Sequence, residues 1–184
     1  MSKPNFFSYN DLASLEALIA EYPEQIACVV LEPSAMQHPA PSLTNPGETY
    51  LHDVQRLCKR HGIVFVLDEM ITGFRWDLKG AQNYYKVQPD LCTFGKAMAN
   101  GFAVAAIAGK RDIMELGSIE FPGRERLFLL STTHGAEMCG LGAFVKNGGI
   151  YATASGCGAY VELWQLFNLF NESESSRGRY RRFL

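Results

Sequence analysis

Ionisable residues follow three short apolar runs of this sequence, and their types suit acid–base or covalent chemistry. Glu32 follows "ACVVL", Asp68 and Glu69 follow "IVFVL", and Lys96 comes directly after "LCTFG". Taken singly, a carboxylate at a strand end usually caps a turn, and a lysine there is usually a solvated surface residue. Taken together, Asp68 and Lys96 are about one βαβ unit apart, which predicts that they lie at neighbouring strand ends.

A lysine and a carboxylate on opposite sides of a flat ligand are the pair that pyridoxal phosphate needs. The lysine amine forms a Schiff base with the cofactor aldehyde, and the carboxylate keeps the pyridine nitrogen protonated so that the ring accepts electrons. This chemistry predicts that both Lys96 and Asp68 are buried. It also predicts that the small residues Gly95, Ala97 and Ala99 leave room for cofactor and substrate beside the lysine.

Three other motifs are incomplete, and we expect no site from them. His134 and Glu137 have the spacing of a metal-binding pair, but no third ligand is evident, so the sequence predicts no metal site. The Gly95-Lys96 pair is not a P-loop, because Asp90 stands where that motif has its first glycine. The stretch "ASGCGAY" lacks the third glycine of a dinucleotide-binding turn.

Two helices are predicted from apolar residues at helical spacing. The first is capped by Asn10 and ends before Pro23, and the second stops at Gly62. Their apolar positions are Leu12, Leu15, Leu18 and Ile19 in the first helix, and Leu51, Val54, Leu57 and Cys58 in the second.

Four strands are predicted, with helical segments between them. The strands are residues 25–32, the apolar run in "IVFVLDEM", "DLCTFG" and "AVAAIAG". Residues 33–47 are predicted to form a loop, and "KGAQNYYKV" is predicted to contain a short helix. The apolar residues of "IVFVL" are continuous rather than alternating, which indicates a strand covered on both faces. Alternating strands and helices predict an α/β domain with a mostly parallel sheet, whose ligands bind beyond the carboxyl ends of the strands.

Composition excludes several other classes of function. Of the 184 residues 47% are hydrophobic, which is typical of a globular domain, and the net charge of −2 gives no reason to expect nucleic acid or an anionic membrane as partner. The cysteines Cys28, Cys58, Cys92, Cys139 and Cys157 are odd in number and widely spaced, which argues against a disulfide framework. No signal peptide or membrane-spanning run is evident, so we expect a cytoplasmic protein.

The sequence resembles the class-III pyridoxal-phosphate-dependent aminotransferases over roughly residues 5–146. The order and spacing of "LEPSAMQ", DE-x-x-TGFR, PDL-x-x-x-GK and "STTHG" carry the resemblance jointly, while "MITGFR" and "GAQNYYKVQPDL" make it closest to the glutamate-1-semialdehyde 2,1-aminomutases. The resemblance implies the large cofactor-binding domain of a fold-type I aminotransferase, with a mostly parallel sheet flanked by helices.

The resemblance also implies roles for individual residues. Lys96 would be the Schiff-base lysine and catalytic residue, Asp68 the partner of the pyridine nitrogen, and Met70 a residue packed on one face of the ring. Thr132 would donate to the cofactor phosphate of the neighbouring subunit in a homodimer, and Glu32 would lie on the substrate side. The substrate would be a small amino acid or amino-aldehyde.

The length and the last part of the sequence depart from the family pattern. We expect residues 1–146 to be a partial large domain of a longer enzyme, and residues 147–184 to be an atypical tail that is disordered or read from a shifted frame. The readings left open are an aminomutase that forms 5-aminolevulinate, a transaminase for another amine and keto acid or aldehyde pair, a non-catalytic fragment, and an unrelated α/β binding protein.

Overall fold

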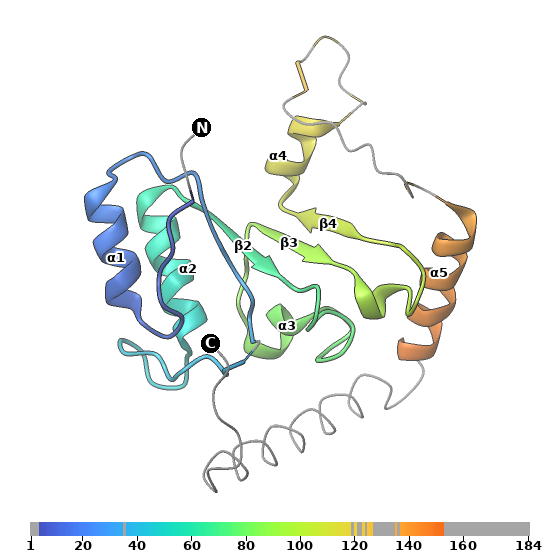
Figure 1. The fold of residues 1–184 in the computed structure, drawn as a ribbon, viewed down its shortest axis with the longest axis horizontal. Coiled ribbons are helices and arrows are strands. Elements are labelled where there is room, and N and C mark those ends of the chain that lie inside the picture. The colour runs from blue at the N-terminus through green and yellow to red at the C-terminus, as the bar shows by residue number, and fades with distance from the viewer. Residues whose placement is uncertain are drawn as a thin grey trace, which may run out of the picture.

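The computed structural model of the chain describes residues 4–34, 36–118 and 137–152, together with residues 120, 123, 125, 126 and 135. Helices and strands alternate through most of this part, as Figure 1 shows. The elements are α1 (Leu12–Glu21), β1 (Cys28–Leu31), α2 (Tyr50–His61), β2 (Val64–Asp68), α3 (Ala81–Tyr85), β3 (Leu91–Phe94), the 3-10 helix η1 (Lys96–Met98), β4 (Ala106–Gly109), α4 (Arg111–Met114), the 3-10 helix η2 (Glu115–Gly117) and α5 (Met138–Ala152).

The four strands form one sheet in the order β1-β2-β3-β4. The first three strands are parallel, and β4 pairs antiparallel with β3. This confirms the predicted α/β fold with a mostly parallel sheet. Because β1, β2 and β3 run in the same direction, the residues that follow them meet at one edge of the sheet.

The start of α1 differs from the prediction, because Asp11 and not Asn10 caps the helix. The Asp11 carboxylate accepts a hydrogen bond from the Ser14 N–H at 3.2 Å. Asn10 has a positive φ of 63° and uses its side chain on the loop after β1, donating to His38 O at 2.9 Å and accepting from the Ala40 N–H at 2.8 Å. The Asn10 side chain, which the local pattern predicted as the helix cap, therefore forms tertiary hydrogen bonds instead.

Helix α2 follows the prediction closely. Its predicted apolar face is buried, with Leu51, Val54, Leu57 and Cys58 each at most 3% exposed. Gly62 ends the helix in a left-handed conformation with φ 66°, where a residue without a Cβ is favoured. Helices α1 and α2 lie side by side (Figure 1), and α2 packs on β2.

The core lies between these two helices and one face of the sheet. It includes Leu15, Ile19, Val29, Leu31, Leu51, Val54, Leu57, Phe65, Leu67 and Cys92. In β2, Phe65 and Leu67 are buried while Val64 and Val66 are only half-buried, so the prediction of a strand fully covered on both faces is wrong for the described residues. The outer strands expose Val30 in β1 by 54% and Ile107 in β4 by 43%.

The longest described helix, α5, has 15 residues and runs without a break past residue 146, the predicted end of the domain. Residues 153–184, the rest of the predicted tail, lie outside the described residues. Within the described ranges, no helix has both the length and the apolar character needed to cross a bilayer.

Candidate active site

The carboxyl ends of β1, β2 and β3 bring the predicted residues to the same edge of the sheet. Leu31 is in register with Leu67, so Glu32 and Asp68 come next on neighbouring strands. Asp68 is in register with Thr93 on β3, three residues before Lys96. The structure therefore places Glu32, Asp68 and Lys96 on adjacent chain segments at one edge of the sheet.

The carboxylate of Asp68 is held in place by two hydrogen bonds. Its Oδ1 atom accepts from Thr93 Oγ1 at 2.8 Å and from the Met70 N–H at 3.0 Å. Oδ2 accepts no hydrogen bond from any residue that the structure describes, so it remains available to an N–H donor on a ligand. Asp68 is half-buried.

Lys96 is the first residue of η1, shortly after the end of β3. Its backbone has a conformation that residues other than glycine rarely adopt. Its φ is 42°, in the left-handed region, which costs about 1–2 kcal/mol for a residue with a Cβ. Its amine makes no ion pair with any described carboxylate. Lys96 is exposed, so the predicted burial of this residue is not seen in the described part of the chain.

The space beside Gly95 is occupied by Met70. A Cβ at Gly95 would overlap Met70 Cε and would lie 2.9 Å from Met70 Sδ. Ala97 and Ala99 are buried, with 5% and 1% of their surface exposed. The prediction that these small residues leave room for a ligand is therefore wrong at Gly95, whose small size lets the Met70 side chain pack against the backbone next to Lys96.

Glu69, the neighbour of Asp68, is completely buried and organises the loop that leads from β2 to α3. Its carboxylate accepts hydrogen bonds from the N–H groups of Ala81 at 2.5 Å and Gln82 at 3.0 Å, and from Thr72 Oγ1 at 3.1 Å. Burial raises the pKa of Glu69 above its ordinary value, while these hydrogen bonds act in the opposite direction. Gly80 (φ 84°) brings the start of α3 so close that a Cβ there would lie 2.6–2.8 Å from the carboxylate.

Glu32 has a buried oxygen without a hydrogen-bond partner among the described residues, Oε2. The hydroxyl of Tyr9 lies nearby and donates to the Pro33 carbonyl at 2.8 Å. Burial, followed by the charges of Tyr85, Tyr50 and Glu32, raises the pKa of Tyr9. An unpartnered buried carboxylate oxygen is costly, so it is a natural contact for a polar ligand.

Two residues at this edge were not predicted as site residues. Thr93 could have been found from strand register, because a parallel partner of Asp68 must lie shortly before Lys96. For Glu69, a role different from that of Asp68 could have been predicted, because successive side chains along a strand point to opposite faces of the sheet.

Thr132 and His134 lie outside the described residues. Among the residues that are described, no three His, Cys, Asp or Glu side chains gather in a way that would hold a metal ion. The described cysteines, Cys28, Cys58, Cys92 and Cys139, are free thiols.

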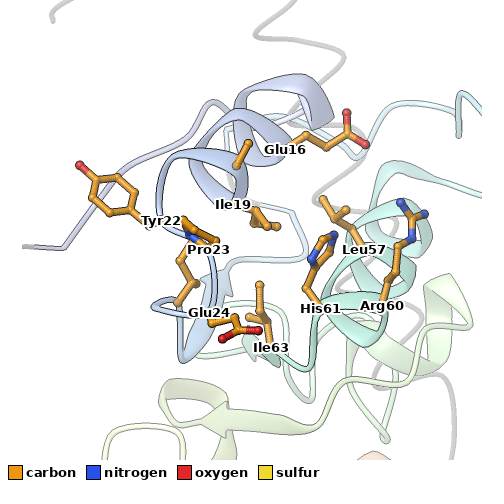
Figure 2. Close-up of a pocket in the computed structure, with 11 residues that line it drawn as sticks. Glu16, Ile19, Tyr22, Pro23, Glu24, Leu57, Arg60, His61 and Ile63 are labelled. Carbon is orange, nitrogen blue, oxygen red and sulfur yellow. The ribbon is translucent and has the colours of Figure 1, made fainter.

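Two cavities occur in the described part of the chain. One of about 660 Å³ lies between the ends of α1 and α2, where Figure 2 shows Glu16, Ile19, Leu57, Arg60 and His61 around it. Another cavity, of about 940 Å³, is lined by the N-terminal segment that begins at Pro4, by residues of α1 and by β1. Neither cavity contains Asp68 or Lys96 in its lining.

Comparison with known proteins matches this chain to class-III aminotransferases, with the aminotransferase class-III family profile covering residues 4–144. Among solved structures, an omega-transaminase from Sphaerobacter thermophilus is 29% identical, with 75% of this chain and 31% of that chain covered and a TM-score of 0.59. A beta-phenylalanine aminotransferase from Variovorax paradoxus is 27% identical, with 78% and 31% covered and a TM-score of 0.60. A transaminase with PLP bound shares the fold at 19% identity, with 78% and 32% covered and a TM-score of 0.66.

The chain spans about a third of the length of these solved structures. The part that it spans contains the mostly parallel sheet and the edge at which Glu32, Asp68 and Lys96 gather. The family profile covers more than half of the 184 residues. The chain therefore belongs to the class-III aminotransferase family.

Proposed function

We propose that this chain carries the cofactor-attachment part of a pyridoxal-phosphate-dependent enzyme that transfers amino groups. The observation that supports this most is the fixed carboxylate of Asp68 at the end of β2, with Lys96 just beyond the end of the neighbouring strand. Bound pyridoxal phosphate supplies an aldehyde that an amine can capture and a ring that draws electrons from the substrate carbon.

The described residues fit such a ligand in their chemistry. Oδ2 of Asp68 accepts no hydrogen bond from a described residue, so it can accept one from a protonated ring nitrogen, and the negative charge of the carboxylate stabilises that protonated form. Lys96 makes no ion pair with a carboxylate of the described residues, so no such contact holds its amine away from a ligand. Lys96 Nζ would hold the cofactor through its aldehyde, with loss of water, and once the substrate amine has displaced it, Nζ would accept and return the substrate proton.

Three further assignments rest on the family resemblance and on position. Met70 packs against Gly95 and, in this proposal, meets one face of the ring. The buried Oε2 of Glu32 has no hydrogen-bond partner among the described residues, and in this proposal Glu32 lies on the substrate side. Thr132 donates to the cofactor phosphate in the neighbouring subunit, so the proposal includes a homodimer. The free described cysteines fit the reducing cytoplasm, where we expect the enzyme to act.

Within this class we propose an aminomutase that converts glutamate 1-semialdehyde to 5-aminolevulinate. The segments "MITGFR" and "GAQNYYKVQPDL" support this choice. The second candidate is a transaminase acting on another amine and keto acid or aldehyde pair. The solved omega-transaminase and the beta-phenylalanine aminotransferase, at 29% and 27% identity, favour it.

Cofactor capture tests the proposal directly. The purified 184-residue chain is mixed with pyridoxal phosphate, reduced with borohydride and digested, and the modified lysine is located by mass spectrometry. We expect the label on Lys96 and its loss in Lys96→Ala. Lys59→Ala, which removes an exposed lysine from α2, is the matched control and should keep the label. An unlabelled Lys96 in the wild-type chain would contradict the proposal.

The reaction itself needs a second assay, because attachment of the cofactor does not establish turnover. The chain is given glutamate 1-semialdehyde alone, and separately a panel of amines with keto acids. Formation of 5-aminolevulinate without a second substrate supports the aminomutase. Turnover only with an amine donor and a carbonyl acceptor supports the transaminase, and no turnover by a labelled chain supports a non-catalytic fragment.

A further inference from the structure

Tyr151 in α5 makes a long-range contact with the segment that carries Lys96. Its hydroxyl donates a hydrogen bond to the Ala97 carbonyl at 3.1 Å, across 54 positions of sequence. Its ring stacks on Phe74, with centroids 6.4 Å apart and planes inclined by 24°. Tyr151 lies beyond residue 146, in the part of the sequence that departs from the family pattern.

The contacted carbonyl belongs to a strained turn. Lys96 has a φ of 42°, and the turn is closed by bonds from the Met98 N–H to Gly95 O at 2.9 Å and from the Asn100 N–H to Lys96 O at 3.0 Å. The acceptors of these bonds are the carbonyls of the successive residues Gly95 and Lys96, and the Tyr151 hydroxyl donates to the next carbonyl, that of Ala97. A strained backbone persists only where its surroundings hold it, and this hydroxyl is a tertiary group that does so.

Packing keeps α5 close to this turn. The Phe74 ring contacts Phe94 at 5.7 Å and Phe144 at 5.9 Å between centroids, so it joins the loop after β2, the end of β3 and α5. A Cβ at Gly140 would lie only 2.6 Å from Val104 Cγ2. The helix is therefore seated by side chains other than Tyr151, and removal of one hydroxyl should leave it in place.

We propose that the Tyr151 hydroxyl is a positioning group for Lys96. By fixing the Ala97 peptide it holds Lys96 in its left-handed conformation, from which the amine serves the cofactor site. This role rests on the proposed function of Lys96. It gives residue 151 a part in the site although the sequence around it lacks the family pattern.

The test compares Tyr151→Phe with the wild-type chain in two measurements. Tyr151→Phe keeps the ring that stacks on Phe74 and removes only the hydroxyl, so the fold is retained. Without cofactor, amide hydrogen exchange at Met98 and Asn100 should become about three- to tenfold faster, as expected for the loss of one hydrogen bond. With pyridoxal phosphate, capture at Lys96 should weaken by a similar factor, and the pH at which the captured cofactor changes its absorption should shift by about half a unit.

Tyr84→Phe is the matched control. The Tyr84 ring packs on Trp76 with centroids 4.9 Å apart, so this variant removes a tyrosine hydroxyl at a place other than the turn. It should change neither measurement. Unchanged exchange in Tyr151→Phe, or faster exchange with unchanged capture and absorption, would overturn the positioning role. Failure of the wild-type chain to label Lys96 would instead overturn the proposed function. The two outcomes are distinguishable, because the first is measured in Tyr151→Phe while the wild-type chain still labels at Lys96, and the second is measured in the wild-type chain itself.

Discussion

Thr93 Oγ1 donates a hydrogen bond of 2.8 Å to Asp68 Oδ1 across the parallel pair β2 and β3. The two residues are in register, so the bond follows directly from the pairing of the strands. It fixes the orientation of the carboxylate that we assign to the pyridine nitrogen. It also links that carboxylate to the strand that leads to Lys96.

Thr93→Val should weaken cofactor capture, because valine keeps the shape of the side chain and removes the donor. Hydrogen bonds to charged groups contribute about 1.5–3 kcal/mol, so we expect the dissociation constant of pyridoxal phosphate to rise about tenfold or more. Titration followed by borohydride trapping at Lys96 measures it. Thr93→Ser keeps the hydroxyl and should stay close to wild type. Equal affinity in the valine variant would show that the bond does not matter for the site.

Gly95→Ala should disturb Met70, because the added Cβ would overlap the end of that side chain. We expect capture at Lys96 to weaken about tenfold as Met70 is pushed from its position beside the lysine. Met70→Ala removes the atoms that the new Cβ would overlap, so Gly95→Ala combined with Met70→Ala should bind the cofactor no more weakly than Met70→Ala alone. A double variant much weaker than Met70→Ala alone would place the damage in the backbone instead.

Glu69→Ala should destabilise the fold strongly. The change leaves the N–H groups of Ala81 and Gln82 and the Thr72 hydroxyl without their shared acceptor, in a completely buried place. We expect the free energy of unfolding to fall by about 2–4 kcal/mol. Urea denaturation measures it, with Glu16→Ala on the exposed side of α1 as the control. A loss of the same small size in both variants would contradict the role given to Glu69.

The thiols should differ sharply in reactivity. Burial raises the pKa of Cys58 and of Cys92 to about 12, whereas Cys28 and Cys139 are exposed. A raised pKa lowers the thiolate fraction, to roughly one in ten thousand at about pH 8, and the thiolate is the nucleophile. Alkylation mapped by mass spectrometry should therefore mark Cys28 and Cys139 first, with Cys58 and Cys92 following only in concentrated urea. Equal rates in the native chain would mean that these two thiols are accessible.

Local patterns in the sequence determined much of the fold. The face of α2, its stop at Gly62 and the alternation of strands and helices all follow from residue spacing and backbone preference, which act over a few positions. The N-terminal cap of α1 was not predicted correctly, because the Asn10 side chain forms hydrogen bonds with the backbone of His38 and Ala40, far away in the chain. Such a competition between local and tertiary partners is decided only when the chain is folded.

The candidate site divides in the same way. The sequence by itself determined that Asp68 and Lys96 follow successive strands, and parallel pairing then brings such residues to one edge. Only the tertiary structure decided that Thr93 orients Asp68, that Met70 fills the space beside Gly95, and that Tyr151 reaches the Ala97 carbonyl. Side-chain packing and hydrogen bonding between distant segments depend on the register of strands and the seating of helices, and neither is encoded in the spacing of a motif.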